Sequence, residues 1–147
     1  MLSLLLAAAA LEPTTEVLLN EAQRALQSGN QVEARRKLAE AKASQEKDDE
    51  AIRQRLAAHQ EWDDCIKTEA ARVTNLQDQL DPLAEAVLGM CLDKERRTRV
   101  LASEVARRLD GLEGDELRND VEATVTRWRQ IQKQTALAIL ARARLAR

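Results

Sequence analysis

The chain has 147 residues, which suits one ordinary domain or about one and a half long helical repeats and excludes two independent α/β domains. Its 23 basic and 25 acidic side chains give a formal charge of −2, so the charge offers no reason to expect a nucleic-acid partner. Phe and Tyr are absent, and the two tryptophans are Trp62 and Trp128. The chain contains only two Pro and four Gly. Because strands favour aromatic and β-branched residues, this composition predicts an all-α protein.

The composition also excludes much catalytic and metal chemistry. One histidine, His59, and two cysteines, Cys65 and Cys91, cannot form a structural zinc site, and the sequence contains no CxxC and no HExxH. The glycine-rich phosphate-binding motifs GxGxxG and GxxxxGK[ST] are absent as well. We therefore expect a protein that is not an enzyme and that has no catalytic residue, no cofactor and no metal site.

Residues 1–13 form an apolar N-terminal segment. Its uncharged part, about eleven residues long, is much shorter than the roughly twenty residues that a membrane-spanning helix needs. The apolar run and the small residues Ala8 and Ala10 resemble a signal peptide, although no basic residue precedes the run. Two interpretations stay open here, a cleaved signal peptide over residues 1–10 and the start of an ordinary helix.

The first predicted helices follow from capping residues and glycine. Thr14 or Thr15 can cap a helix that begins near Glu16, and Gly29 and Asn30 favour its end and the start of the next helix. Residues 32–80 contain neither Gly nor Pro. This stretch predicts one long continuous helix, much longer than an ordinary globular one.

Two further turns are predicted in the second half of the chain. Asp81 followed by Pro82 is typical of a helix start, and the helix that begins there continues to Leu109. Gly111 and Gly114 then turn the chain into a last helix that ends at residue 147.

An internal similarity divides these helices into two parts. The segment VLLNEAQRAL at 17–26 resembles VLASEVARRL at 100–109, and a glycine turn follows each of them. Such colinear similarity indicates a repeat. We therefore expect a partial helical repeat, a helix hairpin, over residues 14–50 and a complete three-helix repeat over residues 51–147.

The predicted core residues share heptad positions, apolar side chains that alternate by three and four along a helix. They are Trp62, Ile66, Val73, Leu76, Leu101, Val105, Val121, Trp128 and Ile131. Antiparallel pairing about turns near Asp81 and Leu112 places both tryptophans in one layer. The same pairing puts Cys65 opposite Arg97, roughly 9 Å along the helix axis from Cys91. It therefore predicts two reduced thiols, which are typical of a cytosolic protein.

The segments HQEWDDCI at 59–66 and VEATVTRWRQIQKQTALAILARARL at 121–145 resemble the spectrin-repeat family, in which tryptophans lie in the first and third helices. The resemblance implies an elongated antiparallel three-helix bundle, preceded by part of a second repeat and joined to it by a long continuous helix. It also implies a cytoplasmic spacer and interaction module in cytoskeletal or nuclear-envelope linkage. Its partners would be other proteins, cytoskeletal or a second copy of the chain, and neither nucleic acid nor a membrane.

Two alternatives remain. The small-residue spacing of a tetratricopeptide repeat is followed by Ala22, Ala25, Gly29, Ala34, Leu38 and Ala41. This resemblance predicts a helical adaptor with a self-contained hairpin over residues 14–50. A signal peptide over residues 1–10 would instead make this a secreted or periplasmic helical protein.

Overall fold

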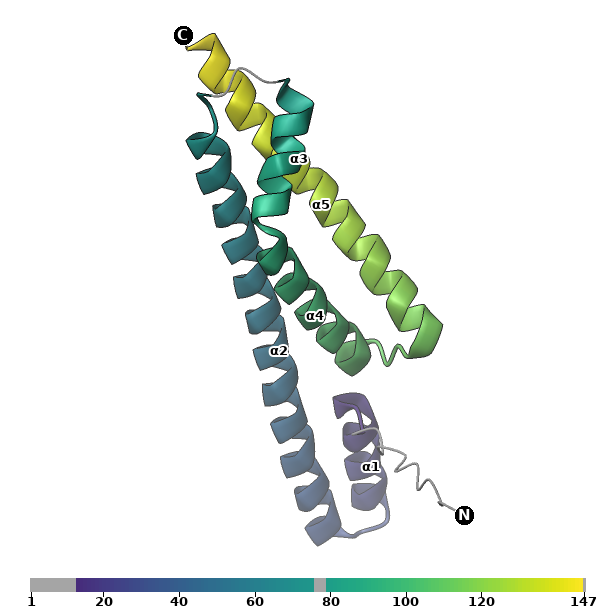
Figure 1. The fold of residues 1–147 in the computed structure, drawn as a ribbon. Coiled ribbons are helices and arrows are strands. Elements are labelled where there is room, and N and C mark those ends of the chain that lie inside the picture. The colour runs from purple at the N-terminus through teal and green to yellow at the C-terminus, as the bar shows by residue number, and fades with distance from the viewer. Residues whose placement is uncertain (1–12, 76–78, 147) are drawn as a thin grey trace, which may run out of the picture. The chain divides into compact units, whose positions relative to one another are not determined.

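The computed structural model describes residues 13–75 and 79–146. All regular structure in these ranges is helical, which confirms the all-α prediction. The helices are α1 (Thr15–Gln27), α2 (Gln31–Arg72), α3 (Leu80–Met90), α4 (Leu92–Leu109) and α5 (Gly114–Leu145) (Figure 1). The chain divides into two compact units, Met1–Lys47 and Asp48–Arg147. The predictions for residues 1–11 and for Leu76 concern positions outside the described ranges.

In the first unit, α1 and the beginning of α2 form a helical hairpin whose ends carry the predicted caps. The Thr14 hydroxyl accepts a hydrogen bond from the Val17 N–H, and the Asn30 side-chain oxygen accepts one from the Glu33 N–H at 3.1 Å. Gly29 has a φ of 77°, the left-handed conformation that ends a helix. The turn predicted at Gly29 and Asn30 is therefore confirmed.

The buried residues of this hairpin are almost all small. They are Leu18, Ala22, Ala25, Ala34 and Ala41. Two polar contacts join the helices beside this alanine seam: the Lys37 ammonium lies 2.6 Å from the Glu21 carboxylate, and the Thr15 hydroxyl donates to the Ser44 hydroxyl at 3.0 Å. These interactions hold the hairpin together with little buried apolar surface.

Gly29 and Gly89 form a matched pair for testing the turn. A Cβ at either position would meet no atom within 4 Å, but only Gly29 has a positive φ. We expect Gly29→Ala to destabilise the hairpin by about 1 kcal/mol, because alanine is strained in the left-handed region. Gly89→Ala should instead stabilise α3 by roughly 0.5–1 kcal/mol. Hydrogen exchange of the amides in each helix measures both effects, and equal shifts at the two sites would contradict this account.

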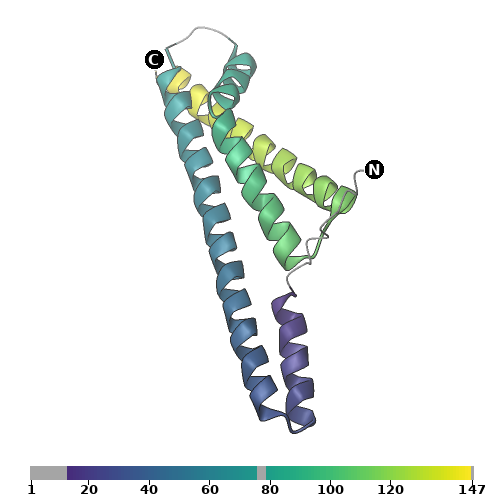
Figure 2. The same ribbon diagram turned by 60° about the horizontal axis from the view of Figure 1, so that its bottom comes forward.

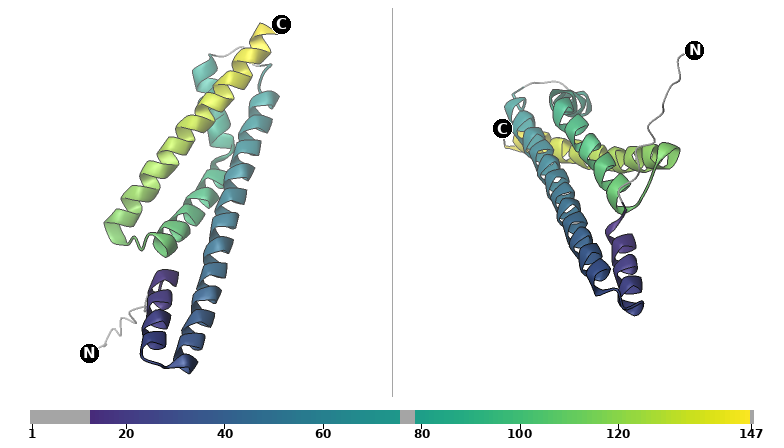
Figure 3. Two further views of the ribbon diagram at one scale, coloured as in Figure 1. Left: turned by 180° about the vertical axis from the view of Figure 1, so that it is seen from behind. Right: turned by 90° about the horizontal axis from the view of Figure 1, so that it is seen from below.

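The second unit contains the end of α2 together with α3, α4 and α5. Figures 1 and 2 show the last turns of α2 and α5 beside α3. Seen from behind, α5 passes along both α3 and α4 (Figure 3). The predicted end of a helix at Leu109 is confirmed, and Gly111 and Gly114 both have positive φ.

Two helix boundaries in this unit differ from the sequence prediction. The helix predicted to continue to residue 80 ends at Arg72, and α3 begins at Leu80, so Asp81 lies inside its first turn rather than capping it. The helix predicted to run unbroken from Pro82 to Leu109 is interrupted at Cys91. The interruption falls two residues after Gly89, a weak helix former, and at a residue bonded to α2.

Ion pairs between α2 and α4 show how these helices align. The Arg97 guanidinium lies 2.7 Å from the Glu61 carboxylate, and the Arg108 guanidinium lies 3.1 Å from the Asp48 carboxylate. The sequence analysis centred the turn near Asp81 and so paired Arg97 with Cys65. Because α2 ends earlier than predicted, each α2 residue faces a residue nearer the N-terminus of the α3–α4 segment. The predicted alignment of the two cysteines was wrong for this reason.

Candidate functional site

The central part of the second unit is where two apolar clusters meet. The first, the Trp62 cluster, consists of Trp62, Ile66, Ala70, Val73, Leu83, Ala84, Val87, Leu88, Cys91, Ala136 and Leu140, from α2, α3 and α5 and the segments that adjoin them. The second, the Val125 cluster, consists of Ala102, Ala106, Val121 and Val125, from α4 and α5. Trp128 packs against both clusters. This residue therefore joins the two halves of the core.

Most of the predicted core residues lie within this region. The structure buries Trp62 and Ile66 completely, and it leaves less than a tenth of Val73, Val105 and Val121 exposed. The side chains of Leu101 and Trp128 are partly buried. The predicted core residues of α2 therefore pack with α3 and α5, and Val121 packs with α4.

Ile131 is an exception and corrects the heptad prediction. Its side chain is 53% exposed, whereas Gln132 is 1% exposed. The heptad pattern takes a step of three residues after Trp128, but the buried face of α5 continues in steps of four through Gln132, Ala136 and Leu140. A straight helix with 3.6 residues per turn drifts from a strict heptad in this way.

The His59 ring lies close to both tryptophans. Its ring centre is 4.9 Å from that of Trp128 and 6.1 Å from that of Trp62. Its Nδ1 is buried and has no hydrogen-bond partner, and the same holds for Trp62 Nε1. Burial lowers the pKa of His59 below its ordinary value, while Asp63 acts in the opposite direction and Arg55 in the same one. Burial therefore favours the neutral imidazole, which lies against the Trp128 ring.

Stability of the second unit should depend on pH through His59. The unfolded chain takes up a proton near the ordinary pKa of 6.5, but the folded chain does so only at lower pH. The stabilisation is therefore complete above about pH 6.5 and is lost as the pH falls from there through the lowered folded-state pKa. We expect His59→Gln to remove this part of the pH dependence. Urea unfolding of both proteins between about pH 8 and 5 measures it, and parallel curves would contradict the assignment.

Two polar side chains of α4 are buried as well. Glu95 is 5% exposed and Thr98 is fully buried, although both belong to the polar segment 93–99. The Arg129 guanidinium donates to the Glu95 carboxylate at 2.7 Å, and the Thr98 hydroxyl donates to the Lys94 carbonyl at 2.9 Å. A buried carboxylate requires such a partner, because desolvation otherwise disfavours its charged form. The contact between α4 and α5 is thus ionic as well as apolar.

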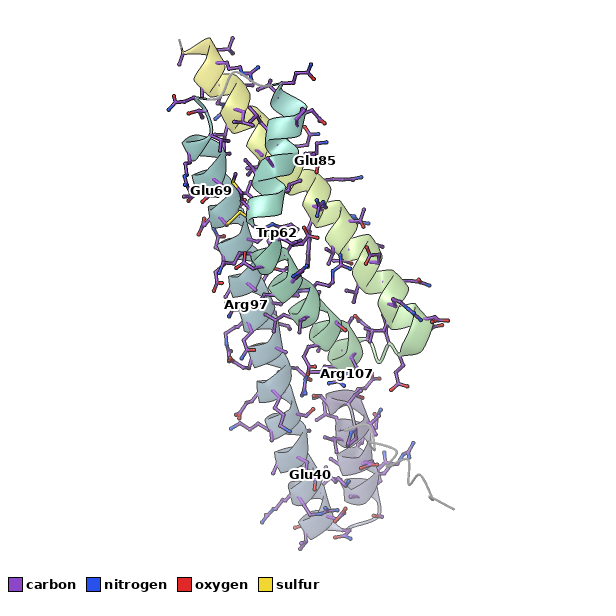
Figure 4. All side chains as sticks on the ribbon, in the orientation of Figure 1. Glu40, Trp62, Glu69, Glu85, Arg97 and Arg107 are labelled. Atoms are coloured by element: carbon purple, nitrogen blue, oxygen red, sulfur yellow. A yellow bond between two sulfur atoms is a disulfide. The ribbon has the colours of Figure 1, made fainter. Side chains whose placement is uncertain are left out.

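A further ion-pair network connects α3 to α5. The Lys133 ammonium lies 2.8 Å from Glu85 and 2.9 Å from Asp81. The hydrogen bond to Glu85 raises the pKa of Lys133 most, and the hydrogen bond to Asp81 raises it further. Glu85, on α3, is labelled in Figure 4. These charges lie near the surface, so they contribute more to specific alignment of the helices than to stability.

The two cysteines form a disulfide, which corrects the prediction of reduced thiols. Cys65 and Cys91 are bonded with their Cα atoms 6.0 Å apart, and no free cysteine is present. Cys65 lies on α2, and Cys91 occupies the interruption between α3 and α4. The sulfur atoms are visible between the labels of Trp62 and Glu69 in Figure 4. The error arose from the misplaced turn, which shifted the facing helices by about six residues or roughly 9 Å.

Two of the surface recesses in the second unit have similar volumes. One, of about 500 Å³, is lined by Glu69, Arg72, Val73, Asn75 and Met90. The other, of about 530 Å³, lies between α4 and α5 and is lined by Val100 and Leu117 together with charged residues that include Arg99, Arg107 and Glu122. Val100 is 67% exposed, so the second recess presents apolar surface to solvent.

The described residues bring together no group of three His, Cys, Asp or Glu side chains that could hold a metal ion. In the same part of the chain, none of the helices has the length and apolar character needed to cross a membrane. Comparison with known proteins finds no protein family, no curated protein and no solved structure that matches the chain. The site combines a disulfide, a partly buried imidazole and paired charges.

Proposed function

We propose that this chain is a structural spacer and protein-interaction module of the spectrin-repeat kind, acting in cytoskeletal or nuclear-envelope linkage. The observation that carries the proposal is the position of the two tryptophans. Trp62 on α2 is fully buried, and Trp128 on α5 packs against both clusters of the second unit. The first and the last helix of the second unit, α2 and α5, thus each contribute one tryptophan to a common core.

The second unit exposes apolar side chains that are accessible to a partner protein. Val100 and Leu56 are 67% and 57% exposed, on α4 and α2 respectively. The pairs Arg97–Glu61 and Arg108–Asp48 align α2 with α4, so the unit can present these side chains on a fixed framework. A spacer that recruits other proteins needs this combination of a defined core and accessible side chains.

Stretching single molecules of the full chain tests the mechanical part of the proposal. We expect the second unit to resist extension and then to unfold in one cooperative event. Trp62→Ala should lower the unfolding force, because it removes the largest buried side chain. Leu56→Ala, on the same helix but 57% exposed, is the matched control and should leave the force unchanged. Gradual extension of the parent protein without a cooperative event would contradict a spacer role.

A second candidate function is that of a secreted or periplasmic helical protein, and the disulfide favours it. Disulfides form and persist in oxidising compartments, whereas cytosolic thiols are kept reduced. The Cys65–Cys91 bond is therefore harder to reconcile with a cytoplasmic spacer than with an exported protein. Expression of residues 1–147 in a secretory host, followed by sequencing of the mature N-terminus, separates the two. Cleavage near Ala8 or Ala10 supports export, and an intact N-terminus in the cytosolic fraction supports the first proposal.

A further inference from the structure

The two sulfurs of the disulfide lie in different surroundings. Cys91 is fully buried in the Trp62 cluster, whereas Cys65 is only partly buried and packs against the edge of the same cluster. An external thiol attacks the sulfur that it can reach, and the other sulfur then becomes the leaving group. The exposure of the two residues therefore selects Cys65 as the sulfur to be attacked.

Cys91 stands where two helices meet. It is the C-cap residue of α3 and the N-cap residue of α4, and its carbonyl accepts hydrogen bonds from the N–H groups of Lys94 and Glu95 at 3.1 and 3.2 Å. Because the end of α3 and the start of α4 carry partial charges of opposite sign, the helix dipoles favour neither sulfur. The choice between the two sulfurs therefore follows from the exposure of the two residues.

An open recess lies beside the segments that carry the two cysteines, and neither cysteine is among its lining residues. It is lined by Glu69 and Arg72, which follow Cys65 on α2, and by Met90, which directly precedes Cys91. Its volume of about 500 Å³ is large enough for a small organic molecule. In Figure 4 the disulfide lies next to Glu69, on the side of α2 that faces α3. The Arg72 side chain is 77% exposed and places a cation at the rim.

We propose that Cys65–Cys91 is a reversible thiol-exchange site for low-molecular-weight thiols. A thiolate RS⁻ attacks Cys65 Sγ, the S–S bond breaks, and its electron pair leaves with Cys91 Sγ as a thiolate. The products are the mixed disulfide RS–Sγ of Cys65 and the Cys91 thiolate, which then takes a proton from solvent. A second thiolate attacks the sulfur of R in the mixed disulfide, releases RSSR and leaves both cysteines reduced. This inference rests on the disulfide and its surroundings, and it does not depend on the proposed spacer role.

The order of bond breakage can be tested on the folded, oxidised full chain. The protein is exposed to glutathione for short times, quenched with acid and alkylated, and the modified peptides are mapped by mass spectrometry. We expect glutathione on Cys65 and the alkyl group on Cys91. Glutathione on Cys91 would overturn the proposal, and so would reduction no faster than global unfolding measured by hydrogen exchange of the Trp62 cluster.

The approach through the recess is tested with a matched pair of variants. Arg72 and Arg53 both lie on α2, are 77% and 67% exposed, and pair with a glutamate three residues earlier. Only Arg72 lines the recess. We expect Arg72→Glu to slow exchange with anionic glutathione several-fold at low salt, while neutral mercaptoethanol reacts at an unchanged rate. Arg53→Glu should change neither rate, and equal effects of the two variants would contradict this route.

Discussion

Reducing the Cys65–Cys91 bond is expected to lower the free energy of unfolding of the second unit by about 3 kcal/mol. The bond closes a loop with a sequence separation of 26 residues, which contains the last turns of α2 and all of α3. In the chain-entropy account, opening a loop of this length gives the unfolded ensemble additional freedom worth about 3–3.5 kcal/mol. Urea unfolding followed by tryptophan emission measures the change, because Trp62 and Trp128 both lie in the second unit.

The matched control is the double variant Cys65→Ala/Cys91→Ala. This variant should unfold at a lower urea concentration than the oxidised parent and should be insensitive to a reducing agent. A parent protein whose unfolding midpoint stays the same after complete reduction would show that the loop is not closed in the native state. A shift in the double variant on adding reductant would show that the agent acts elsewhere.

Trp62→Ala is expected to destabilise the second unit by roughly 3–5 kcal/mol. Trp62 has no exposed surface and contributes the largest side chain to a cluster shared by α2, α3 and α5. Its removal leaves a cavity that the neighbouring helices can fill only in part. Emission from Trp128 continues to report unfolding in this variant, so the same urea experiment applies.

Ile131→Ala is the control that separates burial from apolar character. Ile131 and Trp62 both occupy predicted heptad core positions, but Ile131 is 53% exposed. We expect the isoleucine variant to change the free energy of unfolding by less than about 0.5 kcal/mol. A loss comparable to that of Trp62→Ala would contradict an exposed position of Ile131 on α5.

The features that the sequence predicts correctly depend on local chemistry. Gly29 ends α1 in the left-handed conformation, Asn30 caps α2, and Leu109 is the last residue of α4. Each of these results follows from the conformational range of glycine or from a side chain that bonds to the backbone three residues away. Prediction of the all-α class likewise needs no knowledge of long-range contacts, because it follows from the amino-acid composition.

The errors concern contacts between residues far apart in the chain. Cys65 and Cys91 face each other only because α2 ends at Arg72, and nothing near either cysteine signals that end. The interruption at Cys91 was missed for a similar reason, since Gly89 alone is tolerated within helices. An error in the predicted position of a turn shifts every predicted contact between the two helices that the turn connects.

The polar part of the candidate site was also hidden from sequence reasoning. Glu95 and Arg129 are 34 residues apart, and each looks like an ordinary surface residue on its own helix. Gln132 was passed over because the heptad pattern selected Ile131. An observable signal did exist: successive steps of four from Trp128 lead through Gln132 and Ala136 to Leu140. Testing a 3.6-residue period beside the heptad would have identified this face.

The alanine seam of the first unit has a thermodynamic consequence. Its buried apolar residues are one leucine and four alanines, so opening the hairpin exposes few methylene groups to water. The heat capacity of unfolding scales with newly exposed apolar surface, and the opening should therefore have a small heat-capacity change and a stability that varies little with temperature. Amides of α1 should exchange with solvent through this opening well before those of the Trp62 cluster. Tryptophan emission would not register the event, because the first unit contains no tryptophan.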